Sequence, residues 1–139
     1  MELLPEIDKD KTIANVIHFL NGHQLRVLRA GRKLSSLGSP KIDGMPKPPT
    51  ATNNADKRII ERLEAEYEVD ETYYAVSCLD YKSQKIIKDR WLIQYPKTNE
   101  QIARDLNYGL TRYQEIKKRA LLMFAEAYIA LELRVFKKR

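Results

Sequence analysis

Four of the six prolines in the chain lie between Pro40 and Pro49, and this cluster constrains the fold more than any other feature of the sequence. Proline fixes φ and cannot donate a backbone hydrogen bond, so neither a helix nor a central strand can run through the cluster. We therefore expect residues 34–53 to form a proline-rich linker. It divides the 139 residues into an N-terminal helical element, residues 1–33, and a larger helical domain, residues 54–139.

Apolar residues at helical spacing predict a helix on each side of this linker. In the N-terminal element the spacing predicts one helix from about Lys11 to Arg32. After the linker a second helix is expected from about Asn54 towards Cys78, and whether the chain breaks at residues 69–72 is open. Its apolar side is formed by Ile59, Ile60, Leu63 and Tyr67. Residues 54–80 carry three basic and eight acidic side chains, so this helix is expected to face away from any polyanion.

The C-terminal part predicts three more helices. The first begins near Ser83 and ends before Pro96, because the residue before a proline avoids the helical region. The second is short and begins at Thr98, and the last runs from about Leu110 to Phe136. No segment shows the alternation of a strand. The predicted fold class is therefore all-α: an N-terminal helix, a proline-rich linker and a C-terminal helical bundle.

The net charge of +6 is distributed unevenly along the chain. Residues 1–81 hold 11 Lys and Arg against 13 Asp and Glu, a balance of −2, whereas residues 82–139 hold 14 against 6, a balance of +8. A basic half joined to a weakly acidic half is typical of a chain that binds a polyanion, usually nucleic acid, through one part only. A basic surface kept for solubility is the alternative that charge alone leaves open.

Residues 98–122 have the pattern of a helix-turn-helix. Thr98 and Gln101 can form a capping box at the start of the first helix. Ala103 is small enough for the second helix to cross closely, and Asn107 belongs to the few residue types besides glycine that adopt a left-handed turn conformation. Tyr108 is expected to pack between the two helices. A plain helical hairpin shares much of this pattern, but the capping box, the turn residue and the basic flank together favour DNA binding.

The outward side chains of this unit are the candidate site residues. One face of the second helix presents groups suited to base edges in a major groove: Thr111, Gln114, Glu115 and Lys118. Four side chains at the edges of the unit are expected to bind phosphates: Lys97, Thr98, Arg112 and Lys117. The inward positions, Tyr113 and Ile116, are expected to hold the second helix against the rest of the domain.

The same stretch resembles a known domain. Residues 79–124, with Arg90-Trp91-Leu92 before the turn and Arg119-Ala120-Leu121 after it, are similar to the promoter-reading domain of bacterial sigma factors. Over nearly the whole chain, residues 3–8, the proline-rich linker and residues 118–127 resemble the autolysin regulatory protein (ArpU) family. That resemblance implies a small transcriptional regulator, encoded in phages and prophages of Gram-positive bacteria, that controls late or packaging genes. Gly109 departs from the pattern, because Ser or Thr is usual at that helix N-cap.

Together these features predict a sequence-specific DNA-binding transcriptional regulator that activates late genes of a phage or prophage. Double-stranded DNA is the expected partner, and the N-terminal helix is expected to contact RNA polymerase or a second protomer. Residues 128–136 either pack back on that helix or form a dimer seam; we expect a homodimer, because helix-turn-helix proteins often bind two half-sites. Two alternatives are a small terminase-like DNA-packaging subunit, which would assemble into a larger ring, and a helical protein-interaction module.

Enzymatic, metal-binding and membrane functions are not expected. His18 and His23 do not share a helix face, both are expected to be exposed or partly buried, and no set of three or four metal ligands is visible. Cys78 is expected to be a small buried hydrophobe, and a single cysteine cannot form an internal disulfide. No apolar run approaches the roughly 18 residues that span a bilayer, and no signal peptide is apparent. We expect a protein of the bacterial cytoplasm that needs no cofactor and is not an enzyme.

Overall fold

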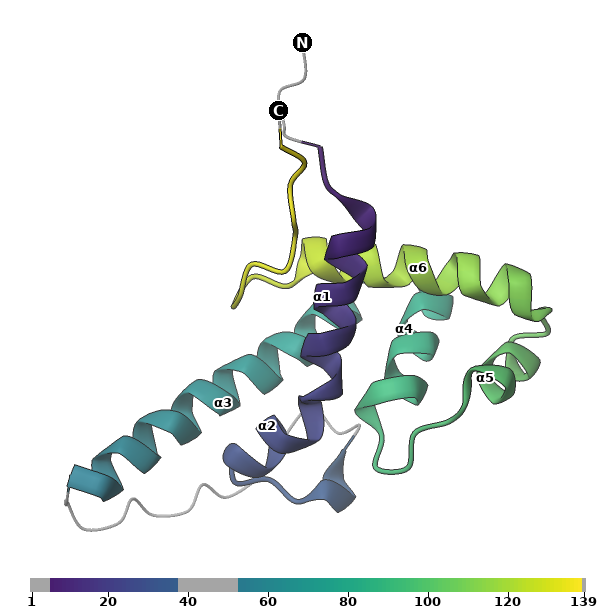
Figure 1. Cartoon of the computed structure of the whole chain (residues 1–139). Coiled ribbons are helices and arrows are strands. Elements are labelled where there is room, and N and C mark those ends of the chain that lie inside the picture. The colour runs from purple at the N-terminus through teal and green to yellow at the C-terminus, as the bar shows by residue number, and fades with distance from the viewer. Residues whose placement is uncertain (1–5, 38–52, 139) are drawn as a thin grey trace.

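The computed structural model describes residues 6–37 and 53–138, and the regular elements in these ranges are helices. In chain order they are α1 (Lys9–Asn21), α2 (His23–Arg29), the 3₁₀ turn η1 (Leu34–Ser36), α3 (Asn53–Ser77), α4 (Tyr81–Ile87), the π-helical turn η2 (Lys88–Leu92), α5 (Asn99–Asp105) and α6 (Leu110–Ala127). The predicted all-α fold class is confirmed (Figure 1). Among the described helices, none has the length and apolar character needed to cross a membrane.

The single N-terminal helix that the sequence predicted is in fact two helices. Asp8 begins α1 by accepting a hydrogen bond from the Lys11 backbone N–H at 3.1 Å. Gly22 separates α1 from α2, since glycine is a poor helix former. α2 ends before Gly31, whose φ of 79° lies in the left-handed region, and the Arg32 N–H donates to the Val27 carbonyl at 3.0 Å. The prediction of one helix to Arg32 is therefore wrong in two respects: the chain breaks at Gly22, and the second helix ends at Arg29.

Both N-terminal helices pack against elements that follow the proline-rich stretch. α1 lies against α6 and contributes three side chains to the largest core cluster: Val16, Phe19 and Leu20. α2 lies against α3, and their contact is made by small and medium side chains: Val27, Ala30, Ala65 and Val69. The residues before and after the proline-rich stretch are therefore packed in the same hydrophobic cores. The first residues of the expected linker form η1, whereas residues 38–52 lie outside the described residues.

Helix α3 is continuous from Asn53 to Ser77, so the chain has no break at residues 69–72. The face that the sequence assigned to its apolar side is not the buried one, because Ile60, Leu63 and Tyr67 are 56%, 51% and 52% exposed. The buried side chains lie on the opposite face: Ala65, Val69, Thr72, Ala75 and Val76. Figure 1 shows the N-terminal end of α3 projecting away from α4, α5 and α6.

The last helix ends at Ala127, so the prediction that it continues to Phe136 is wrong. The following chain runs back along the N-terminal residues, as Figure 1 shows. The Asp8 N–H donates to the Val135 carbonyl at 2.7 Å, and the Lys137 N–H donates to the Glu6 carbonyl at 2.8 Å. Leu133 is buried in the core cluster that contains α1. Of the two alternatives for residues 128–136, packing against the N-terminal helix is confirmed, and these backbone hydrogen bonds replace those of a longer α6.

Candidate nucleic-acid interface

Helix α5 begins with the predicted capping box. The Thr98 hydroxyl accepts a hydrogen bond from the Gln101 backbone N–H at 3.2 Å, and the Gln101 side-chain oxygen accepts one from the Thr98 N–H at 2.9 Å. Thr98 is exposed. Because its oxygen acts as the acceptor, its hydroxyl hydrogen remains available to a group outside the protein. On the inner side, Ile102 and Ala103 are buried.

The turn between α5 and α6 has the conformation that Asn107 predicts. Its φ is 62°, and among the described residues other than glycine it alone has a positive φ. The Asn107 N–H donates to the Arg104 carbonyl at 3.0 Å, and the Tyr108 N–H donates to the Ala103 carbonyl at 2.9 Å. These two bonds form a Schellman motif, which ends α5 abruptly and fixes the direction in which α6 leaves.

Helix α6 is held by a small core that it shares with α4 and α5. Tyr113 and Ile116 are buried there as expected, together with Ile86, Ile102 and Ala103. The Tyr113 hydroxyl donates to the Asn99 side-chain oxygen at 2.8 Å. Burial raises the pKa of Tyr113 to about 12, so this hydroxyl keeps its proton at neutral pH. The inward side of α6 is thus anchored at its first two turns.

The four expected base-reading side chains lie on the outer side of α6, and all are exposed: Thr111, Gln114, Glu115 and Lys118. Glu115 is not free of partners, because the Arg112 guanidinium lies 3.1 Å from its carboxylate. Both side chains are more than 60% exposed, and such surface ion pairs contribute only about 0–1 kcal/mol. Within the described ranges, Lys118 takes part in no salt bridge.

Lys97, expected to bind phosphate, lies in a cluster of opposite charges. Its ammonium nitrogen is 3.0 Å from the Asp105 carboxylate and 3.6 Å from that of Asp89. The hydrogen bond to Asp105, and then the charge of Asp89, raise the pKa of Lys97. Lys85 lies 2.8 Å from Asp89, and the Lys97 backbone N–H donates to the Asp89 carbonyl at 2.9 Å. The cluster ties the loop before α5 to η2 and so positions the capping box.

Lys117, also expected to bind phosphate, points towards the protein. Its ammonium group donates to the Asn99 side-chain oxygen at 3.4 Å and lies 5.5 Å from the centroid of the Trp91 ring. Burial, and then the charge of Arg90, lower the pKa of Lys117. The other two phosphate-binding candidates, Thr98 and Arg112, are exposed at the edges of the unit.

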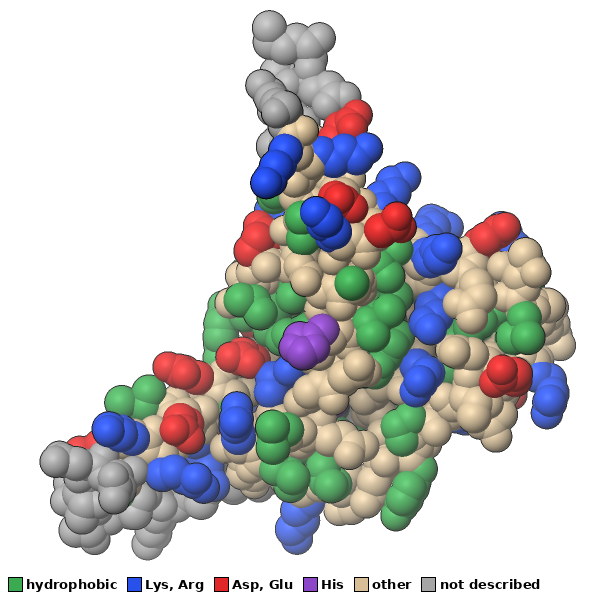
Figure 2. Space-filling view, viewed as in Figure 1, with side chains coloured by type: hydrophobic (Ala, Val, Ile, Leu, Met, Phe, Trp, Pro, Cys, Tyr) green, Lys and Arg blue, Asp and Glu red, His purple; other side chains and the backbone are tan. Residues whose placement is uncertain are grey.

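Three further cations on α4, α5 and α6 were not among the site residues chosen from sequence: Lys82, Arg104 and Arg119. Lys82, at the start of α4, donates to the Tyr108 hydroxyl and lies 5.0 Å from the centroid of its ring. Arg104 and Arg119 are exposed, and neither is in a salt bridge within the described part of the chain. Figure 2 shows Lys and Arg side chains gathered over α4 and α6. The basic composition of residues 82–139 was the available signal, but it does not reveal that Lys82 lies beside the turn.

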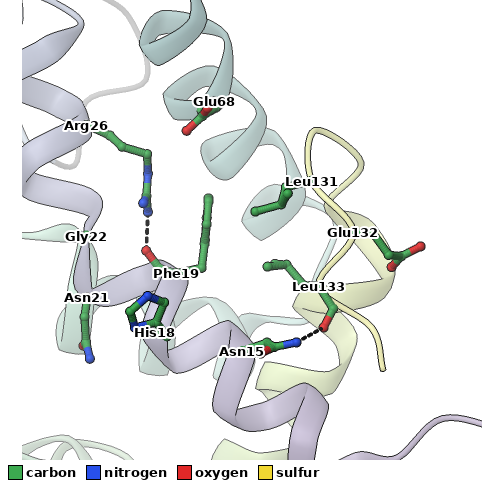
Figure 3. Close-up of a pocket in the computed structure, with 10 residues that line it drawn as sticks. All are labelled: Asn15, His18, Phe19, Asn21, Gly22, Arg26, Glu68, Leu131, Glu132 and Leu133. Atoms are coloured by element: carbon green, nitrogen blue, oxygen red, sulfur yellow. Dashed lines mark hydrogen bonds between the residues drawn. The ribbon is translucent and has the colours of Figure 1, made fainter. Parts of the chain in front are cut away.

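A pocket of about 670 Å³ lies elsewhere, between α1, α3 and the C-terminal segment (Figure 3). The Arg26 guanidinium lies 3.7 Å from the centroid of the Phe19 ring and donates to the Phe19 carbonyl. The Asn15 amide donates to the Leu133 carbonyl at 3.3 Å. These bonds hold α2 and the C-terminal segment to α1. None of the candidate DNA-contacting side chains lines this pocket.

His23 and Cys78 differ from expectation. His23 is fully buried, with its Nε2 3.3 Å from the Tyr73 hydroxyl, whereas His18 is exposed. Burial, and then the charges of Arg26 and Arg32, lower the pKa of His23 to about 4. Cys78 is exposed instead of buried. Among the described residues, no group of three or more His, Cys, Asp and Glu side chains could hold a metal ion.

The fold and the site define an all-α protein in which a short turn leads into a helix with an exposed polar face. Basic side chains surround that face. The chain is 34% identical over 128 residues to "Putative autolysin regulatory protein ArpU" of Enterococcus hirae, covering 92% of this chain and 93% of that protein. A protein of the same name from Streptococcus phage O1205 is 28% identical over 130 residues, covering 91% and 93%. This chain therefore belongs to the ArpU family, whose curated relatives carry the name of a regulatory protein. No family model and no solved structure matches it.

Proposed function

We propose that this protein is a sequence-specific DNA-binding regulator of transcription, and that α5, the turn and α6 form its helix-turn-helix. The observation that carries the proposal is the Schellman turn at Asn107. It directs α6 so that Tyr113 and Ile116 face the core while the polar side remains open. A recognition helix needs this combination, because it must be anchored from behind and present hydrogen-bonding groups in front.

In the proposed complex the outer face of α6 enters a major groove. Gln114 can form a bidentate pair with adenine, Lys118 can donate to guanine, and Glu115 can accept from the amino group of cytosine. Thr111 can contact either a base edge or a thymine methyl group.

Phosphate contacts would set the register of α6 on the duplex. Thr98 can donate its free hydroxyl hydrogen, and Arg112 can exchange Glu115 for a phosphate at small cost, because the exposed pair is weak. Lys97 and Lys117 belong to the same proposal, although each has partners in the protein that a phosphate would have to replace. Further positive charge on α4, α5 and α6 comes from Lys82, Arg104 and Arg119.

The names of the relatives in the family support a regulatory role. One relative comes from a phage, and both relatives are named as regulatory proteins. We propose accordingly that the chain acts on genes of a phage or prophage, by activating late genes. Binding to DNA and contact with RNA polymerase, without catalysis, would be sufficient for this role.

The test begins with selection of binding sites from a random double-stranded DNA library, followed by fluorescence anisotropy on the selected site. Gln114→Ala and Glu115→Ala should each weaken binding to that site by about 1–3 kcal/mol and relax the preference at one base pair. Glu64→Ala, which removes an exposed carboxylate on α3, is the control and should leave the preference unchanged. If both α6 variants retain the affinity and selectivity of the parent, α6 is not the reading helix.

A further inference from the structure

Helix α3 carries a row of large apolar side chains on the side opposite the core. Its members are Ile60, Leu63, Tyr67 and Tyr74, which are 56%, 51%, 52% and 63% exposed. Spacings of three, four and seven residues keep them on one face of the helix, along about 21 Å of its length. The buried residues Ala65, Val69 and Val76 lie on the other face, so α2 and the core approach from behind the row.

The spacing of this row is that of a coiled-coil seam. With Ile60 at position a of a heptad, Leu63 falls at d, Tyr67 at the next a and Tyr74 at the a after that. Asp70 occupies the remaining d position and already pairs with Arg32 at 2.7 Å. Aligned apolar side chains of this size on a helix surface mark an interaction site, whereas single exposed apolar residues do not.

The charges of α3 indicate what covers the row. Its three cations all lie in its first half: Lys57, Arg58 and Arg62. Residues 66–77 contain no cation and four carboxylates: Glu66, Glu68, Asp70 and Glu71. A parallel copy of the helix would place carboxylates beside carboxylates. An antiparallel copy instead brings the mixed first half of one helix beside the acidic second half of the other.

We propose that α3 pairs antiparallel with the α3 of a second copy of this chain. A register that sets Leu63 of each copy against Tyr67 of the other joins the centres of the two rows. The same register places Lys57 beside the second copy's Glu71 at flanking positions on one side of the seam, with one such pair near each end. The interface is isologous and closes after two copies, as a two-fold dimer requires.

The pairing leaves the outer face of α6 open, because the seam uses a different helix. It also gives the protein a dimer surface that does not involve residues 128–136, which are packed against α1. The inference does not depend on DNA binding, since the mass of the protein reports it directly.

Sedimentation equilibrium of the full chain tests the proposal. The average mass should rise with concentration from 16.3 kDa towards twice that value. The double variant Leu63→Gln, Tyr67→Gln should stay at the mass of one chain, with unchanged helix content by circular dichroism, because both side chains are about half exposed. Leu25→Gln, which changes a leucine of α2 that is 55% exposed, is the matched control and should dimerise like the parent.

Charge exchange separates a second copy from an unrelated partner helix. Lys57→Glu and Glu71→Lys should each weaken the dimer several-fold, and the double variant should restore it, because the two residues meet across the seam. The proposal is overturned by a single species of 16.3 kDa at every concentration. A dimer that the Leu63, Tyr67 double variant leaves intact, or charge variants that do not compensate, would overturn it as well.

Discussion

Lys117 and Lys118 are neighbours with the same side chain and opposite surroundings. Lys117 is bonded to Asn99 and lies over Trp91, whereas Lys118 is exposed. In the proposed complex Lys117 exchanges Asn99 for a phosphate, so Lys117→Ala should weaken binding to every sequence and reduce the slope of log affinity against log salt by about one unit, whereas Lys118→Ala should mainly relax the preference at one base pair. Anisotropy titrations at several salt concentrations measure both slopes. An unchanged slope for Lys117→Ala would mean that Lys117 keeps its bond to Asn99 in the complex and binds no phosphate.

His23 gives the folded protein a pH dependence with a definite sign. Its pKa is lowered to about 4, whereas in the unfolded chain it returns to about 6.5, so the unfolded state binds the proton first as pH falls. Stability contributed by the neutral ring is present above pH about 6.5 and is lost as pH falls towards about 4, by about 3 kcal/mol in all. Burial of the ring, and then the charges of Arg26 and Arg32, disfavour the added charge.

Urea unfolding across this pH range measures the effect. His23→Gln should flatten the pH dependence, because the group that takes up the proton is gone. His18→Gln is the control: His18 is exposed, and its removal should leave the dependence as in the parent. A parent protein equally stable at both ends of the range would show that the ring does not stay neutral in the fold.

Single residues could be predicted from sequence where local geometry decides their role. Thr98 and Gln101 cap α5, and Asn107 takes the left-handed conformation, because each depends only on residues within one turn. His23 could not be predicted as buried, since its environment comes from Arg32 and from Tyr73 on a helix beyond the proline-rich stretch. Cys78 was expected to be buried but is exposed, again because its surroundings depend on tertiary contacts that the sequence pattern does not contain.

At the scale of helices, the periodicity of apolar residues predicted that a helix exists better than it predicted which face of the helix is buried. α3 has apolar residues on two faces, and the larger ones, Leu63 and Tyr67, suggested the wrong side. Small residues occupy the buried side because α2 approaches closely there, with Gly31 so near the Arg62 guanidinium that a Cβ would lie 2.9 Å from it. The size of the residues on a face therefore reflects the distance of its partner, which a single helix pattern does not contain.

The end of α6 shows the same limit. Residues 128–136 are apolar enough to continue a helix, and their sequence contains no proline or glycine to stop it. They leave the helix because the N-terminal chain offers other partners: the Thr12 hydroxyl accepts from the Val135 N–H at 2.9 Å. Pairing between the two ends of a chain has no local signature, so the sequence could offer packing against α1 only as one of two alternatives.

In the whole molecule, the candidate interface depends on segments near both ends of the chain. α6 passes from the turn at Asn107 into the main core, where Phe124 contacts Phe19 of α1 with ring centroids 6.3 Å apart. The C-terminal segment also packs in this core, through Leu133. Trp91 donates to the Asn21 side chain at 3.0 Å, which ties η2 to the same helix. α1 is thus a structural brace for the helices that carry the candidate interface.

This brace leads to a prediction about two leucines of the C-terminal segment. Leu133 is 3% exposed in the core beside α1, whereas Leu131 is 53% exposed. Leu133→Ala should lower the free energy of unfolding by about 2–5 kcal/mol, because it opens a cavity between the segment and α1. Leu131→Ala, the matched control, should change it by less than about 0.5 kcal/mol. Urea unfolding monitored by circular dichroism and by Trp91 fluorescence should give coincident transitions if α1, η2 and the segment unfold together. Equally small effects of the two substitutions would show that the segment does not brace α1, and that the helices carrying the interface fold without it.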